Sequence, residues 1–139
     1  MKIVIKILSF ILMVSFLSCE KDFVTNCQDC TAEEPVNVEL TISVEDLVSS
    51  SFNFTINIYE GNLEDNLLIK SFTLQSRNVT YYEAQINKKY TVTASYSFGN
   101  RTYIAVDSTI PRIRYVTNEC DQPCYYVYNK SLNLRLKYQ

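Results

Sequence analysis

Apolar and polar side chains alternate through most of the chain after residue 35, and this period of two restricts the fold more than any other feature. Apolar residues occupy every second position of 36–44, and the same alternation returns at 52–58, 90–98 and 132–138. Successive side chains of a β-strand point to opposite faces, so each segment has one face for a core and one for water. No run of ten residues has the three-and-four spacing of an amphipathic helix. The pattern predicts an all-β domain.

Short segments and frequent turn signals refine this prediction. A bulge is expected near Tyr82, Gly99-Asn100 predicts a turn, Pro111 ends the region before it, and Asn129-Lys130 predicts a last hairpin. Seven to nine short strands, each with one apolar face that can be buried, are typical of an antiparallel two-sheet sandwich. At this level the chain resembles immunoglobulin-like and transthyretin-like sandwiches. We expect strands at 36–44, 52–58, 67–74, 79–86, 90–98, 102–106, 125–128 and 132–138.

The first 18 residues have the pattern of a secretory signal peptide. Lys2 and Lys6 supply a positive start, and an apolar stretch from 7 to 17 follows, interrupted only by two serines. This stretch is shorter than the ~20 apolar residues that span a bilayer. The alternative is an uncleaved N-terminal anchor helix.

The segment ends in Phe16-Leu17-Ser18-Cys19, which resembles the lipobox of bacterial lipoproteins, although Phe16 stands where the family usually has Leu. With Glu20-Lys21-Asp22 after the cysteine, the chain resembles lipoproteins of the Bacteroidetes type. The resemblance implies cleavage before Cys19, lipid on its sulfur, and an outer-membrane protein that faces the periplasm or the cell surface. Glu20-Lys21-Asp22 is then either a surface-export tag or a solvated tether. The expected organisation is a signal peptide at 1–18, a lipidated tether at 19–35 and a β-sandwich domain at 36–139.

Four cysteines remain beside the lipidated one, in the groups Cys27/Cys30 and Cys120/Cys124. An even number of thiols in an exported chain favours disulfides. We favour bridges between the two groups over two local bridges, and the partner of each cysteine stays open. The spacing also permits a four-thiolate zinc site or a thioredoxin-like redox motif. An oxidising compartment and the polar surroundings favour neither, so we expect no metal and no cofactor.

Tyrosines gather at two places, and Asp107-Ser108-Thr109 forms a third candidate site. Adjacent tyrosines on a strand point to opposite faces, so one of each pair should face outward, where it can bind a glycan or a protein. The simpler interpretation is cross-strand pairing that stabilises the sheet. Asp107-Ser108-Thr109 resembles a short O-glycosylation signal of Bacteroidetes-type exported proteins, which makes Ser108 a candidate acceptor. The tyrosines of the candidate binding face are Tyr81, Tyr82, Tyr125, Tyr126 and Tyr128.

The residues argue against catalysis and against nucleic-acid binding. The chain has no His, and its formal net charge of −2 comes without a concentrated run of Lys and Arg. No spacing singles out a carboxylate pair or a nucleophile motif. We expect a non-enzymatic, membrane-anchored binding or accessory module for a protein or glycan. The alternatives are a structural component that docks into an envelope assembly or secretion machine, as transthyretin-like lipoproteins do, and, with the least support, a small enzyme.

Overall fold

The computed structural model describes residues 25–44, 53–75 and 79–136, and this part of the chain is all-β, as predicted. Strands account for 62% of it, and it contains no α-helix. No helix in these ranges has the length and apolar character that crossing a membrane requires. Two short 3-10 helices, η1 (Cys27–Asp29) and η2 (Leu63–Asp65), accompany the strands. The strands are β1 (Cys30–Thr31), β2 (Asn37–Ser43), β3 (Asn53–Glu60), β4 (Leu68–Gln75), β5 (Val79–Gln85), β6 (Tyr90–Phe98), β7 (Arg101–Thr109), β8 (Arg112–Val116), β9 (Cys124–Tyr128) and β10 (Ser131–Asn133).

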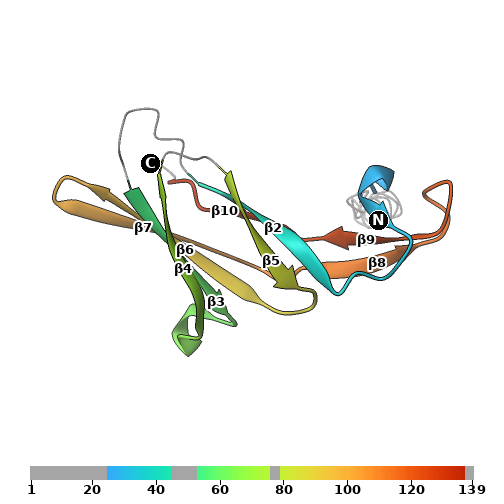
Figure 1. Cartoon of the computed structure of the whole chain (residues 1–139), viewed down its shortest axis with the longest axis horizontal. Helices are drawn as coiled ribbons and strands as arrows, with labels where there is room; N and C mark the ends of the chain where they lie inside the picture. Colours follow the sequence, from blue (N-terminus) through green and yellow to red (C-terminus); the bar gives the residue numbers. More distant parts are fainter. Residues whose placement is uncertain (1–24, 45–52, 76–78, 137–139) are drawn as a thin grey trace, which may run out of the picture.

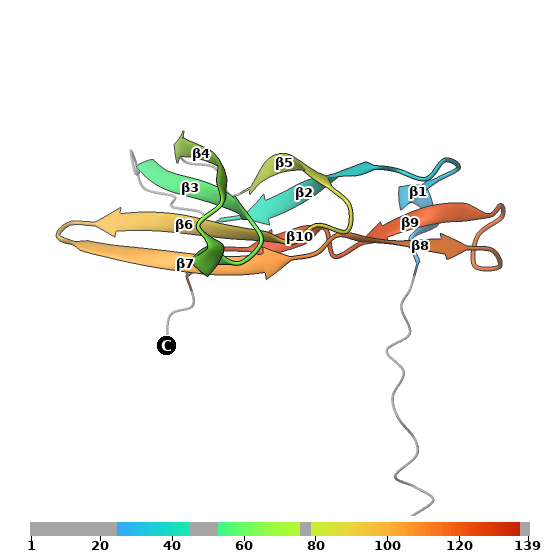
Figure 2. The ribbon, with the colours of Figure 1, turned by 90° about the horizontal axis from the view of Figure 1, so that it is seen from below.

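The strands form three small sheets, one more than the sequence predicts (Figures 1 and 2). Their orders are β4-β3-β6-β7, β10-β2-β5 and β1-β9-β8. Only the β10–β2 pairing is parallel among the strand pairs described. The β1-β9-β8 sheet lies at one end of an elongated molecule. The chain passes through it first in β1, returns to it after β7 for β8 and β9, and leaves it toward β10.

Buried side chains from the two other sheets form a single hydrophobic cluster. Leu40 and Ile42 of β2, Ile56 and Ile58 of β3, and Val92 of β6 are fully buried members of it. They occupy the alternate apolar positions of the sequence, so the predicted core faces of these strands are confirmed. A fully buried aliphatic side chain contributes ~1.5–3 kcal/mol relative to an exposed one, which makes this cluster the main source of stability.

Tyr96 places a hydroxyl group inside this core. Its ring stacks on that of Phe54 with 5.4 Å between the ring centroids. Its hydroxyl donates a hydrogen bond of 2.9 Å to the carbonyl oxygen of Leu134, in the segment that follows β10. The bond therefore links the four-stranded sheet to the segment that continues the other sheet.

Tyr96→Phe should lower the free energy of unfolding by about 1–3 kcal/mol, because it leaves a buried carbonyl without this donor. Urea denaturation of the variant and the parent measures the difference. Tyr103→Phe is the matched control, because Tyr103 lies opposite Tyr96 on β7 with its side chain 42% exposed. Equal losses in the two variants would contradict a specific role for the Tyr96 hydroxyl.

The predicted hairpin around Asn129-Lys130 is wrong. β9 pairs with β8 and β1, whereas β10 pairs in parallel with β2, so the chain changes sheets here instead of reversing within one. Asn129 has a positive φ of 57°, and the carbonyl of Lys130 accepts a 2.8 Å hydrogen bond from the amide of Thr41 in β2. The last strand ends at Asn133; residues 137–139 lie outside the described part of the chain.

Two further details differ from expectation. The β2–β5 register runs without interruption through Tyr82, so the predicted bulge is absent there, and a register shift lies instead between Ile58 and Tyr59 where β3 meets β4. β8 was not predicted at all. It begins at Arg112, directly after Pro111, so the proline separates two successive strands rather than ending the region.

Candidate functional site

β7 is an edge strand that exposes apolar side chains. It pairs with β6 along its whole length, and no other described strand pairs with its second edge. Ile104 and Val106 stand opposite Ser95 and Thr93 of β6, on the face away from the hydrophobic cluster, and are 63% and 51% exposed. A row of unpaired backbone groups beside exposed apolar side chains is the usual template for pairing with another chain.

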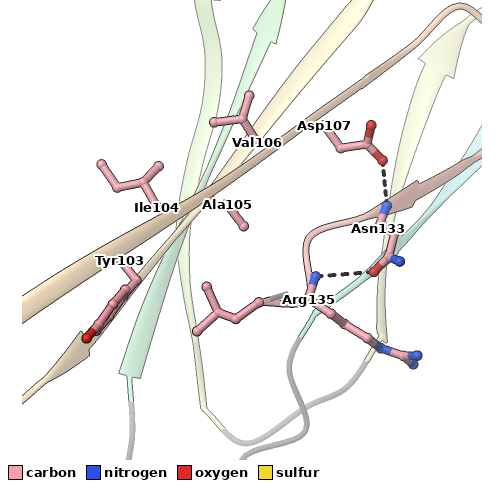
Figure 3. A pocket seen from close by; sticks show the side chains of 8 residues that line it. Tyr103, Ile104, Ala105, Val106, Asp107, Asn133 and Arg135 are labelled. Carbon is pink, nitrogen blue, oxygen red and sulfur yellow. Dashed lines mark hydrogen bonds between the residues drawn. The ribbon is translucent and has the colours of Figure 1, made fainter. Parts of the chain in front are cut away.

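A hollow of about 420 Å³ lies beside this edge (Figure 3). Residues 103–107 line one side of it, and Asn133, Arg135 and Leu136 line the other. We call it the β7 groove. In the sequence, the groove corresponds to the run Tyr103-Ile104-Ala105-Val106, which places apolar side chains on both faces of a strand. The predicted binding face consisted of tyrosines elsewhere in the chain and did not include this run.

Asp107 closes one end of the β7 groove and is already engaged. Its Oδ2 accepts a 2.7 Å hydrogen bond from the amide of Asn133, and its Oδ1 accepts a 2.8 Å bond from the amide of Ser108. The carboxylate thus ties β7 to β10. This use of both oxygens favours a structural role over acid–base chemistry.

Ser108, the candidate glycan acceptor, is exposed on β7 next to Asp107. It lies on the rim of two further shallow hollows, one of about 380 Å³ and one of about 570 Å³. Lys89 lines both of them, and Arg112 lines the larger. The hydroxyl therefore stands in an open, polar part of the surface.

The five candidate tyrosines are divided between two sheets. Tyr81 and Tyr82 lie on β5, whereas the other three lie on β9. Tyr81 is 58% exposed, but Tyr82 is half-buried, with its ring 6.0 Å from that of Tyr90 and the ammonium of Lys70 5.7 Å from its centroid. Burial is the main cause that raises the pKa of the Tyr82 hydroxyl, and the nearby Tyr90, Glu60 and Glu83 raise it further, so the hydroxyl stays neutral.

On β9 the tyrosines also point to different faces. Tyr125 stands opposite Tyr115 of β8, with 4.9 Å between the ring centroids, whereas Tyr126 stands opposite Arg114 and Cys30. Neighbouring strand positions point to opposite sides, so the two rings lie on different faces. The tyrosines therefore do not form one continuous binding face. Tyr125 instead makes a cross-strand pair with Tyr115, as the simpler interpretation of the tyrosines expects.

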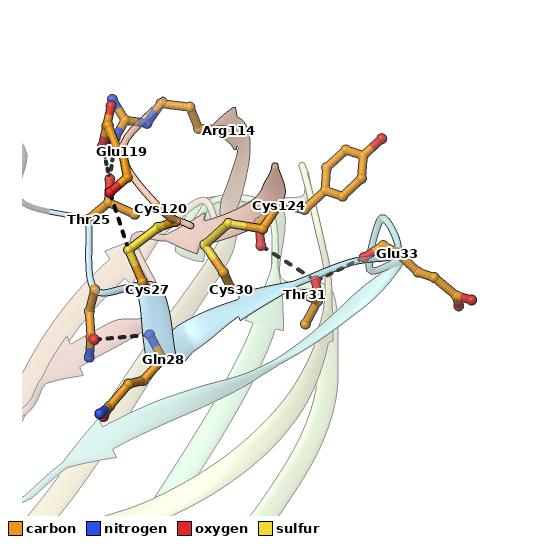
Figure 4. Close-up of a disulfide and its surroundings, with 12 residues drawn as sticks. Thr25, Cys27, Gln28, Cys30, Thr31, Glu33, Arg114, Glu119, Cys120 and Cys124 are labelled. Atoms are coloured by element: carbon orange, nitrogen blue, oxygen red, sulfur yellow. Dashed lines mark hydrogen bonds and ion pairs between the residues drawn. A yellow bond between two sulfur atoms is a disulfide. The ribbon is translucent and has the colours of Figure 1, made fainter. Parts of the chain in front are cut away.

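Two disulfides join the two groups of cysteines (Figure 4). Cys27 pairs with Cys120 and Cys30 with Cys124, which are 93 and 94 residues apart in sequence. These are bridges between the groups, the arrangement that the sequence favours.

The segment that carries Cys27 and Cys30 also makes contacts of its own. The guanidinium of Arg114 donates to the Thr25 hydroxyl and, at 2.8 Å, to the carboxylate of Glu119. Asp29 lies 3.7 Å from the ammonium of Lys130. Residues 25–31, expected within the tether, are thus docked on β8 and β9; Cys19 and residues 20–22 lie outside the described part of the chain.

Carboxylates near the β7 groove, the candidate tyrosines and the disulfides take part in contacts within the chain. Three of the carboxylates beside these features already hold partners: Asp107 binds two backbone amides, Glu119 binds Arg114, and Glu60 lies 3.1 Å from the ammonium of Lys88. Comparison of the chain with protein-family models, with curated proteins and with solved structures finds no significant match.

Proposed function

We propose that this chain is an outer-membrane lipoprotein, anchored through Cys19, that acts outside the cytoplasm as a non-enzymatic binding module for an extended segment of a partner protein. The β7 groove carries the proposal. Its exposed apolar side chains and the unpaired edge beside them fit a strand of another polypeptide.

The lipobox resemblance and the docking of residues 25–31, shortly after Cys19 in the sequence, support the anchor. Cys19 precedes Thr25 by six residues, which can span at most ~20 Å. Residues 25–31 are docked on the β1-β9-β8 sheet, so the anchor would hold that end of the molecule near the membrane. Figure 1 shows the turn between β6 and β7 at the opposite end of the molecule, which suits contact with a partner away from the lipid.

We further propose that the four-stranded sheet and the β10-β2-β5 sheet form a sandwich of the immunoglobulin-like or transthyretin-like kind. The hydrophobic cluster that they share supports this interpretation. The β1-β9-β8 sheet then extends the sandwich at the membrane side.

Backbone chemistry favours a protein over a glycan as the ligand. An added strand satisfies the N–H and C=O groups of an edge strand, and its alternate side chains contact the exposed residues of that edge. Ile104 and Val106 provide such contacts on the nine-residue strand β7. A glycan would be favoured by one exposed aromatic strip, and the candidate tyrosines are split between two sheets. Docking into an envelope assembly, the structural alternative, would use the same edge.

Val106→Lys should reduce partner binding at least about fivefold, because an apolar anchor at the centre of an interface contributes more than ~1 kcal/mol. In intact cells, a photo-reactive residue at position 104 should link to a partner polypeptide, and Val106→Lys should remove that product. Leu68→Lys is the matched control, since Leu68 is also 51% exposed and also lies on an edge strand of the same sheet.

The outcomes separate the functional classes. A protein product that depends on Val106 but not on Leu68 supports the proposal. Equal effects of the two lysine variants, or a product that is a glycan, would overturn it.

A further inference from the structure

The backbone groups on the outer edge of β7 belong to every second residue of the strand. Phe98 and Arg101 pair across the two-residue turn between β6 and β7, and the first and last residues of such a turn share a hydrogen bond. Hydrogen-bonded and non-hydrogen-bonded pairs alternate along an antiparallel ladder, so the even-numbered residues of β7 direct their N–H and C=O groups away from β6. These residues are Thr102, Ile104, Val106 and Ser108.

The sequence of β7 is nearly the same in both directions from Ala105. The branched aliphatic residues Ile104 and Val106 flank it, and the small hydroxyl residues Thr102 and Ser108 follow at three positions on either side. A two-fold interface requires a patch that is its own complement, because each residue of one copy meets the counterpart residue of the other. The outer edge of β7 meets this requirement.

We propose that the segment bound at the β7 groove is β7 of a second copy of this chain, paired antiparallel about Ala105; this inference rests on the proposed function of the groove. Ile104, which is 63% exposed, then stands opposite Val106 of the second copy, which is 51% exposed in one chain, and each covers the other. On the other face of the strand, Tyr103 of the second copy stands opposite Asp107, beside the hollow of about 420 Å³.

Charge favours this edge over the other edge of the same sheet. Residues 102–106 are uncharged, and the charged residues Arg101 and Asp107 have opposite signs. In the proposed register Arg101 is a diagonal neighbour of Asp107 of the second copy, a separation of ~7–8 Å that long side chains can reach. The other edge strand, β4, carries the exposed Lys70, and a lysine on an edge strand opposes pairing.

The orientation of β7 in the molecule is compatible with such a dimer. β7 runs along the long axis, away from the β1-β9-β8 sheet (Figures 1 and 2). Antiparallel pairing therefore places the two β1-β9-β8 sheets at opposite ends of the dimer. Neither proposed membrane anchor lies at the interface.

Ala105→Cys tests the pairing and its register together. Ala105 faces itself across the two-fold axis in a non-hydrogen-bonded pair, where Cα atoms are ~4.5 Å apart and a disulfide can form. Cells that produce the full chain with Ala105→Cys should contain a covalent product of twice the chain's intact mass, which a reductant converts to single chains. Tyr103→Cys is the matched control, because its two copies lie four positions apart along the strands, at least ~13 Å, and should not be linked.

Charged variants of the same chain test the facing positions. Val106→Lys added to Ala105→Cys should reduce the covalent product at least about fivefold, whereas Leu68→Lys added to it should leave the product unchanged. Ile104→Glu places the opposite charge at the facing position. When chains with Val106→Lys and Ile104→Glu are produced together, each with Ala105→Cys, the mixed product should exceed both products of identical chains.

The outcomes distinguish this inference from the proposed function. Absence of the Ala105→Cys product, or equal products from positions 103 and 105, would overturn the dimer. If the photo-reactive residue at position 104 then links to a different polypeptide, the groove keeps its proposed binding function with another partner; if it links to none, both proposals are wrong. If Ala105→Cys fails to fold, the intact mass of the product at position 104 decides, and only twice the chain's mass supports the dimer.

Discussion

Cys19→Ala is expected to move the protein from the membrane fraction to the soluble fraction. The lipid on Cys19 is the proposed attachment, and each buried methylene of an acyl chain contributes ~0.8 kcal/mol. Ten methylenes alone amount to roughly 8 kcal/mol, or about six orders of magnitude in partitioning. In the ranges that the structure describes, no helix is long and apolar enough to cross a membrane.

Fractionation of cells by ultracentrifugation, with detergent-phase partitioning, measures this effect. Cys120→Ala serves as the control, because it removes a thiol without removing the acylation site, and it should stay with the membranes. If Cys19→Ala also stays with the membranes and its intact mass includes residues 1–18, the uncleaved anchor helix replaces the lipoprotein interpretation.

Strand faces were predictable from the sequence because alternation is a property of a single strand. Leu40, Ile42 and Val92 are buried where the pattern places them. The partner of a strand is a property of two distant segments, and alternation does not encode it. Leu132 is buried in the parallel β10–β2 pairing and would equally be buried in a hairpin with β9, so the pattern could not distinguish these arrangements.

Polar positions on central strands show a second limit. Thr91 and Thr93 belong to the predicted wet face of β6, yet they are only 4% and 5% exposed. β6 lies between β3 and β7, so both strands flank these small side chains: Tyr59 of β3 stands opposite Thr91, and Val106 of β7 stands opposite Thr93. The Thr91 hydroxyl also donates a 2.7 Å hydrogen bond to the carbonyl of Gly61. The pattern along one strand does not show how much of its surface the neighbouring strands bury.

The candidate site was likewise predictable from the sequence only in part. The cysteines could be identified because their chemistry is carried by residue type, whereas their individual partners depended on the docking of residues 25–31. The β7 groove exists because β7 is an edge strand, and the residue pattern of a single strand does not indicate whether that strand lies at the edge of its sheet. Tyr103-Ile104-Ala105-Val106 was read as an ordinary strand, because apolar residues on both faces also suit a strand that is covered on both sides.

Removal of both disulfides should destabilise the protein by nearly three times the loss that follows from removing either one. A first bridge across about 93 residues contributes about 4.7 kcal/mol in the chain-entropy model. Once it is formed, the second bridge closes a ring of only about 8 residues and adds about 2.5 kcal/mol. Either pairwise replacement should therefore cost about 2.5 kcal/mol, and replacement of all four cysteines about 7 kcal/mol, comparable with the whole stability of many domains.

Urea unfolding of three variants measures this difference: Cys27→Ala with Cys120→Ala, Cys30→Ala with Cys124→Ala, and all four together. Both pairwise variants should remain folded with similar midpoints, and the fourfold variant should lose most of its cooperative transition. The two bridges share almost the same long loop, so either one alone supplies about two-thirds of the stabilisation that both supply together. Additive losses in the three variants would mean that each bridge acts locally in the native state, through the packing of residues 25–31 on β9, rather than through the entropy of the unfolded chain.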